Sequence, residues 1–171
     1  LSKRCLTTIR EHGHYALLQK LDYKIHNINS LSHDESRSVE ERIDIALNKF
    51  SRLSGSEVVT PRHVVEEMLS ILPTEALDGK ILDIASKQGE FAAVLAAHLG
   101  EDAKDKLYSL CTSPLAYELT RKIYSILGLP VGNICEGFTT YDLISPDKKQ
   151  NIIKKLKDMG FSTIIGNPPY Q

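Results

Sequence analysis

The sequence has little cysteine and almost no net charge. Its three cysteines, Cys5, Cys111 and Cys135, are far apart and form no CxxC pair. A disulfide framework or a zinc site is therefore not expected, and a reduced, cytoplasmic setting fits this cysteine usage. The formal net charge of the 171 residues is -1 at pH 7, so the overall charge does not indicate a nucleic-acid-binding protein.

Long hydrophobic stretches are also missing. No apolar run approaches the roughly 18 residues that a membrane-spanning helix needs, and the sequence shows no signal peptide. Neither export nor a membrane partner is therefore predicted. The composition, 42% hydrophobic and 25% charged, is that of a globular domain. Because the chain begins with Leu1 rather than Met, we expect it to be a fragment of a longer protein.

Residues 1–54 are expected to form a helical arm. Apolar residues recur at helical spacing from Ile9 to Leu21 and again from Val39 to Phe50. Between these stretches, residues 27–38 are rich in Ser, Asn and Asp, which predicts a loop. The arm contains no strand pattern, so we interpret it as an appendage that packs on the following domain or on a partner.

Residues 55–171 alternate between short apolar runs and helical patterns. The four apolar runs that predict strands are residues 80–85, 106–112, 132–136 and 161–166. The helices are predicted at residues 60–72, 90–99, 114–127 and 146–159. Thr60 is expected to cap the first of these helices, with Pro61 in its first turn. This alternation predicts an α/β fold whose parallel sheet is covered on both faces and binds ligands at the carboxyl ends of its strands.

The tetrapeptide Asn167-Pro168-Pro169-Tyr170 follows the last predicted strand. The two prolines fix two backbone dihedral angles and remove two amide donors. The Asn167 side chain and the Pro168 carbonyl can then accept both hydrogens of an exocyclic amine, while Tyr170 stacks on the heterocycle. A base within a duplex must be flipped out to reach such a pocket. A rigid turn with no catalytic role would also account for these residues.

This tetrapeptide resembles the signature of the amino-methyltransferases of DNA. The similarity extends over residues 55–171 and includes SGSEVVTPRHVVEEML, which resembles the segment before the sheet in restriction–modification methylases. The resemblance implies part of a Rossmann-like fold that binds S-adenosylmethionine, with Thr60 and Pro61 beside that cofactor. It also implies double-stranded DNA as substrate, adenine N6 as the methylated atom, and specificity or restriction subunits as partners.

The segment ILDIASKQGEF occupies the place of the cofactor loop in this family. Asp83, Ala85, Gly89 and Phe91 match the family pattern, and the resemblance makes them cofactor-binding residues. Lys87 and Gln88 stand where the family has Gly-Ser. Lys87 is therefore expected to point outward or to meet the carboxylate end of the cofactor.

Two further positions depart from the family pattern. Cys111 stands where an acidic residue usually holds the ribose hydroxyls, and a thiol accepts hydrogen bonds poorly. Phe138 is expected to pack on the adenine ring of the cofactor, with Glu136 and Asp142 as nearby acids. No histidine has a metal-ligand partner at helical spacing, so no metal site is predicted.

Three interpretations remain open. The first is a DNA adenine-N6 methyltransferase, of which this fragment by itself is not expected to methylate. The second is a methyltransferase for an RNA base or a protein glutamine, because the same tetrapeptide serves planar amides and amines of several kinds. The third is a scaffold module that keeps the fold without binding the cofactor, which Lys87, Gln88 and Cys111 favour.

Overall fold

The computed structural model describes residues 19, 23, 26–50 and 58–168. Within the arm, helix α3 (Val39–Phe50) is preceded by Ser38, which caps it. The Ser38 hydroxyl accepts from the amide of Glu41 at 3.1 Å, and the Glu41 carboxylate accepts from the amide of Ser38 at 3.0 Å. This reciprocal pair satisfies two backbone donors that a helix otherwise leaves free. The helix predicted from Val39 to Phe50 is confirmed, whereas the one predicted from Ile9 to Leu21 lies almost wholly outside the described residues.

The arm packs against the rest of the molecule through an apolar cluster. Residues 26–31 are helical, although the polar sequence predicted a loop. Ile28 and Leu31 lie in this helical stretch and are buried together with Phe50 and Ile123. Burial of apolar side chains is what overrides the local preference of Ser and Asn for loops.

The centre of the fold is a parallel sheet of three strands, β1 (Lys80–Ser86), β2 (Leu107–Cys111) and β3 (Phe161–Ile165). The strand order is β2-β1-β3, and β1 pairs in parallel with both neighbours. Three of the four predicted strands are thereby confirmed.

The third predicted strand, residues 132–136, is wrong. The short 3₁₀ helix η3 (Val131–Asn133) occupies its first two residues, and only Ile134 forms a bridge, to Ser109 of β2. Pro130 has no amide donor and Gly132 has no side chain to pack, so too little of this segment supports a strand. The bridge nevertheless places the segment beside β2, and the chain then crosses over to add β3 on the other side of β1. Such a reversal in strand order marks where open α/β sheets bind ligands.

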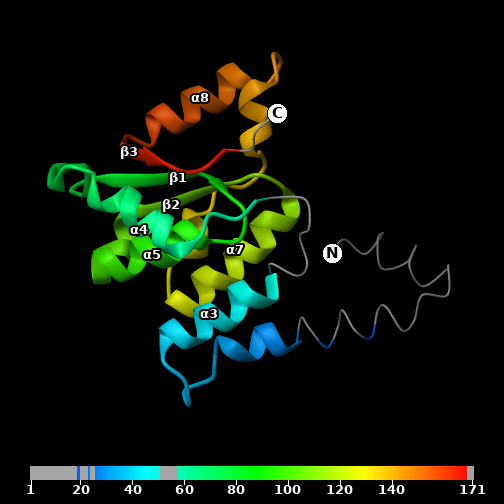
Figure 1. Ribbon diagram of the computed structural model, residues 1–171. Coiled ribbons are helices and arrows are strands. Elements are labelled where there is room, and N and C mark those ends of the chain that lie inside the picture. The colour runs from blue at the N-terminus through cyan, green and yellow to red at the C-terminus, as the bar shows by residue number, and fades with distance from the viewer. Residues whose placement is uncertain (1–18, 20–22, 24–25, 51–57, 169–171) are drawn as a thin grey trace.

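Helices cover both faces of the sheet (Figure 1). On one face lie α4 (Arg62–Ser70), α5 (Glu90–Leu99) and α7 (Pro114–Leu127), and α3 packs on α7. On the other face lies α8 (Lys149–Asp158), whose Ile152 and Leu156 pack with Leu82 and Leu110. The α/β class is therefore confirmed, and the arrangement is compatible with part of a Rossmann-like fold. No helix in the described part of the chain is long and apolar enough to span a membrane.

Short helical elements complete the connections between strands. They are η1 (Thr74–Leu77), η2 (Gly100–Asp102), α6 (Ala103–Lys106) and η4 (Thr140–Ile144).

The boundaries of helix α7 are set by residues in its local sequence. Ser113 caps it by accepting from the amide of Ala116 at 3.1 Å, Pro114 occupies its first turn, and Gly128 ends it at φ +69°.

Candidate functional site at the carboxyl ends of the strands

The turn between β1 and α5, residues 87–89, is buried. Gly89 adopts φ +81°, and a Cβ added there would lie 2.9 Å from the Cβ of Ile123. Only glycine fits this conformation and this close approach. Of the neighbouring predicted site residues, Ala85 is buried at the strand end, and Phe91 lies in the main core with no exposed surface. Phe91 is therefore a core residue of α5.

Polar atoms without partners are concentrated in this turn. The unpartnered buried side-chain atoms within the described residues are Asp83 Oδ2, Gln88 Oε1, Gln88 Nε2 and Glu90 Oε1. Buried polar groups are nearly always hydrogen-bonded, and leaving one unpaired costs about 1–3 kcal/mol. All four atoms belong to residues 83–90, next to the carboxyl end of the central strand. Within the described residues, the buried side-chain hydrogen bonding is therefore least complete at the carboxyl end of the central strand.

The two carboxyl groups in this cluster are held partly by backbone amides. Asp83 Oδ1 accepts from the amide of Ala85 at 3.3 Å, and Glu90 Oε2 accepts from the amide of Gln88 at 3.0 Å. Burial raises the pKa of Asp83 well above its usual range, and the charge of Glu90 raises it further. Burial also raises the pKa of Glu90, against the opposing effect of the backbone amides of Glu90 and Gln88. Because both carboxyl groups are buried and the charge of one disfavours the charge of the other, they resist being charged together.

Lys87 does not point outward, which was the first of the two alternatives expected from the sequence. It is 3% exposed, and its Nζ donates to the Val58 carbonyl at 2.6 Å. Lys87 thus ties the turn to the segment that leads into α4. Its ammonium also lowers the pKa of Asp83 and of Glu90, which partly offsets the effect of burial.

Thr60 and Asn167, predicted from separate motifs, are brought together. Asn167 Nδ2 donates to Thr60 Oγ1 at 3.1 Å, across a sequence separation of 107 residues. The predicted capping role of Thr60 is wrong, because Pro61 is the N-cap residue and no side chain caps α4. The Thr60 hydroxyl is directed at Asn167 instead, which leaves it out of reach of the amides of the first helical turn.

Gly166 brings the end of β3 against the end of β1. It adopts φ +154°, and a Cβ there would lie 3.3 Å from the backbone nitrogens of Ala85 and Ile84. Sequence reasoning missed this residue, although a glycine between a strand and an Asn-Pro pair is a signal of close backbone approach. Pro168 is exposed beyond it, and Pro169 and Tyr170 lie outside the described residues.

Cys111 and Phe138 lie apart from this cluster. Cys111 is 2% exposed in the main core, beside Thr120 of α7, and burial raises the pKa of its thiol to about 12. It therefore faces α7 and presents no acceptor to a ligand. Phe138 packs on the α8 face, where Lys155 Nζ lies 5.6 Å from its ring centroid. Phe138 and Tyr117 line a separate hollow of 440 Å³.

Thr140 is a second residue that sequence reasoning missed. Its hydroxyl donates to the Ile84 carbonyl at 2.7 Å and lies 3.5 Å from the Leu110 carbonyl, so it spans the ends of β1 and β2. The signal for its position is the neighbouring capping box, in which Thr139 and Asp142 bond each other's backbone. Asp142 is occupied by this cap and by the Lys148 ammonium at 2.7 Å, which lowers its pKa.

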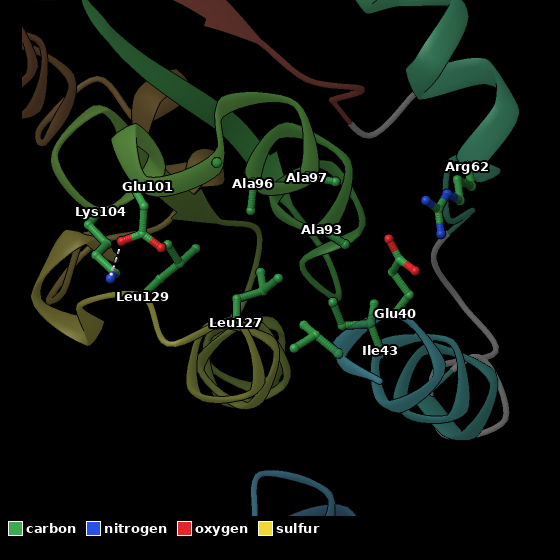
Figure 2. A pocket seen from close by; sticks show the side chains of 12 residues that line it. Glu40, Ile43, Arg62, Ala93, Ala96, Ala97, Glu101, Lys104, Leu127 and Leu129 are labelled. Atoms are coloured by element: carbon green, nitrogen blue, oxygen red, sulfur yellow. Dashed lines mark hydrogen bonds and ion pairs between the residues drawn. The ribbon is translucent and has the colours of Figure 1, made fainter. Parts of the chain in front are cut away.

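The groove on the helical side of the molecule contains fewer polar side chains that could take part in binding or catalysis. Figure 2 shows a groove between α3, α5 and α7, where Ala93 and Ala96 face Ile43 and Leu127. The groove contains none of the predicted site residues. Within the described ranges, no group of three or more His, Cys, Asp or Glu side chains is placed to hold a metal ion.

Comparison with known proteins does not assign this chain to a family. No protein-family model, no curated protein and no solved structure matches the sequence significantly.

Proposed function

We propose that this chain is the amino-terminal part of the catalytic domain of an S-adenosylmethionine-dependent DNA adenine-N6 methyltransferase. The observation that carries the proposal is the hydrogen bond from Asn167 Nδ2 to Thr60 Oγ1. It joins the tetrapeptide to the Thr-Pro segment at the strand-order reversal, beside the turn that holds the unpartnered polar atoms.

The bond between Thr60 and Asn167 orients the amide for accepting an amine. Because Nδ2 is directed at Thr60, the side-chain oxygen of Asn167 lies on the other side of the amide group. That oxygen and the carbonyl of the exposed Pro168 are then the two acceptors for the hydrogens of an exocyclic amine. Holding both hydrogens leaves the nitrogen lone pair directed away from the protein backbone, which is the orientation that attack requires.

The residues of the β1–α5 turn fit the amino-acid end of the cofactor. Asp83 Oδ2 and Glu90 Oε1 are unpartnered acceptors for an ammonium group, and Gln88 Nε2 is an unpartnered donor for a carboxylate. The cofactor would supply an activated methyl group at this place. The ribose end fits less well, because Cys111 is buried in the core and offers no carboxylate to the hydroxyls.

Methyl transfer measured on the full-length natural protein tests the proposal. Labelled S-adenosylmethionine is supplied with duplex DNA, and N6-methyladenine is detected by mass spectrometry. Asn167→Ala is expected to reduce transfer by about 100-fold or more, because it removes an acceptor that positions the reacting nitrogen. Asn151→Ala on the exposed surface of α8 is the matched control and should leave the rate unchanged. Full transfer by the Asn167 variant would contradict the assignment.

Two other substrates are separated in the same assay. Structured RNA and a glutamine-containing peptide replace the duplex, and preferential methylation of either would replace DNA as the proposed substrate. The tetrapeptide chemistry is shared by all three, so the Asn167 variant should fail on whichever is used.

A scaffold function is favoured by one observation, the buried contact of Lys87 with Val58. It places a lysine side chain where the family pattern has a glycine. Under this alternative the chain would show no calorimetric heat with S-adenosylmethionine at millimolar concentration.

A further inference from the structure

Helix α8 presents a row of lysines to solvent. Its ten residues, KQNIIKKLKD, include four lysines and a single acid, Asp158. Lys149, Lys154 and Lys157 are exposed and form what we call the lysine row, whereas Lys155 is directed at an aromatic ring. The row extends over about 12 Å, because an α-helix rises about 1.5 Å per residue. Since the whole chain has a net charge of -1, this helix is a local concentration of positive charge.

The lysine row differs from most other basic side chains on the surface in having no acidic partner. Ion pairs with nearby carboxylates are formed elsewhere by Arg37, Arg62, Lys104, Lys106 and Arg121. Among the described residues, none of the three lysines of the row is ion-paired, not even with Asp158 on the same helix. The three charges are therefore available to an anionic partner.

The lysine row runs from the candidate site toward the opposite edge of the sheet. Helix α8 lies on the face opposite α4, α5 and α7 (Figure 1). It packs at one end on η4, whose Thr140 hydroxyl donates to the Ile84 carbonyl near the carboxyl end of β1 at 2.7 Å. Just beyond its other end, the Met159 carbonyl accepts from Nζ of Lys80, the first residue of β1, at 3.2 Å. An anionic chain that lies along the row therefore reaches the edge of the sheet that holds the candidate site.

The composition of α8 discriminates between classes of anionic partner. A helix that binds a membrane surface inserts apolar side chains beside its lysines, but Ile152 and Leu156 are buried against the sheet. Every exposed residue of α8 is polar or charged, so the helix offers no apolar or aromatic anchor to a protein partner. Single-stranded nucleic acids are held by aromatic side chains on which their bases stack, and α8 contains none. A duplex, whose bases stay stacked and whose phosphates face outward, needs only the positive charges.

We propose that the lysine row of α8 binds the phosphate backbone of double-stranded DNA beside the candidate site. The row neutralises phosphates and does not read the bases. The choice of DNA over double-stranded RNA rests on the proposed function, whereas the use of a duplex backbone follows from the charge and composition of the helix.

Fluorescence anisotropy of a short labelled DNA duplex, titrated with the chain in the absence of any cofactor, tests the inference. Binding should weaken steeply as the salt concentration rises from about 50 to about 200 mM, because released counterions drive the association. A duplex of RNA and vesicles containing phosphatidylserine are added as competitors at equal phosphate concentration. Absence of DNA binding, tighter binding of the RNA duplex, or displacement of the DNA by the vesicles would each overturn the proposal.

A triple variant with Lys149→Gln, Lys154→Gln and Lys157→Gln locates the surface. It should bind DNA about tenfold or more weakly, and its slope of log affinity against log salt should be less steep by about 2–3. Glutamine is a good helix former, so the variant should keep the circular dichroism spectrum of the wild type.

The matched control makes the same change in net charge on the other face of the sheet. It carries Lys49→Gln, Lys104→Gln and Lys122→Gln, on α3, α6 and α7, and should change DNA affinity by less than about twofold. Equal weakening in the two triple variants would mean that only the total charge matters, which would overturn the assignment to α8.

This result and the methyl-transfer assay fail independently of each other. Lysine-dependent DNA binding without methyl transfer to DNA would contradict the proposed function and leave the α8 surface assigned. Methyl transfer to DNA by a protein whose lysine-row variant binds DNA as tightly as the wild type would overturn the α8 surface alone.

Discussion

At the scale of single residues, the candidate site depends on close backbone approaches that two glycines permit. Gly89 opens α5 against Ile123, and Gly166 lets the end of β3 reach the backbone of Ala85. Around these approaches the side chains of Asp83 and Glu90 are buried with part of their hydrogen bonding unmet. The residues that would hold a ligand are therefore also residues that cost the isolated fold stability.

Gly89→Ala is expected to destabilise the protein by about 2–4 kcal/mol, measured by urea unfolding. The added Cβ is disfavoured at φ +81° and also lies 2.9 Å from the Cβ of Ile123. Gly128→Ala is the matched control, because Gly128 has φ +69° but nothing within 4 Å of an added Cβ. It should lose only about 1 kcal/mol, the cost of the backbone conformation. Equal losses in the two variants would contradict the close approach.

Asp83→Asn is expected to make the stability of the protein less sensitive to pH. Burial raises the pKa of Asp83 above its ordinary value of 3.8, so the folded chain retains a proton that the unfolded chain releases as the pH rises above that value. The stability of the wild type therefore falls with rising pH in this range. The Asn variant lacks this pH-dependent loss and should be the more stable of the two at pH 7. Urea unfolding at pH 4 and pH 7 measures the difference. Parallel changes in both proteins would mean that Asp83 is not buried in its neutral form.

At the scale of elements, the arm is part of the folded unit. Helix α3 contributes Phe50 and Ala46, both without exposed surface, to a cluster that includes Ile123 and Ile126 of α7. Because α7 also packs on β1 and β2, the arm reaches the sheet through a single intermediate helix.

Phe50→Ala is expected to lower the free energy of unfolding by about 3–5 kcal/mol, because it leaves a cavity between α3 and α7. Ile71→Ala, at a side chain that is 82% exposed, should change it by less than about 0.5 kcal/mol. Urea unfolding followed by circular dichroism provides both values. A loss for Phe50→Ala as small as that of the control would indicate that the arm does not dock on α7.

The sequence predicted those elements whose boundaries are marked locally. Helix α7 lies between Ser113-Pro114 and Gly128, and α5 follows a turn that ends in Gly89, so both were placed correctly. Residues 26–31 were not predicted to be helical, because their helix depends on burial against α7 rather than on their own polar composition. The strand expected around Ile134 failed because only one residue reaches the neighbouring strand.

The sequence predicted individual residues of the candidate site but not the contacts between them. Thr60 and Asn167 were each singled out from their motifs, but their hydrogen bond depends on how β3 is placed beside β1. The inward direction of Lys87 depends on the carbonyl of Val58, which no pattern around residue 87 encodes. The burial of Cys111 follows from its register opposite Ser86, beneath α7.

At the scale of the whole molecule, the buried side-chain atoms that lack partners among the described residues lie at one place, the carboxyl end of the central strand where the strand order reverses. Sheets of this kind bind ligands there. A ligand that binds only the folded chain raises its stability in proportion to the logarithm of the ligand concentration. Under the proposed function, the unpaired atoms that destabilise the chain without a ligand are the same atoms that a bound cofactor would satisfy.

The most direct test of the central claim is a calorimetric titration of the chain with S-adenosylmethionine. Saturable binding with a dissociation constant below about 1 mM, corresponding to about 4 kcal/mol, is predicted, because the amino-acid end of the cofactor satisfies atoms of Asp83, Gln88 and Glu90. Asp83→Asn should weaken this binding by at least about tenfold, and Asp147→Asn, on the exposed segment before α8, should leave it unchanged. No heat of binding at millimolar cofactor, from a chain shown to be folded by circular dichroism, would contradict the methyltransferase assignment.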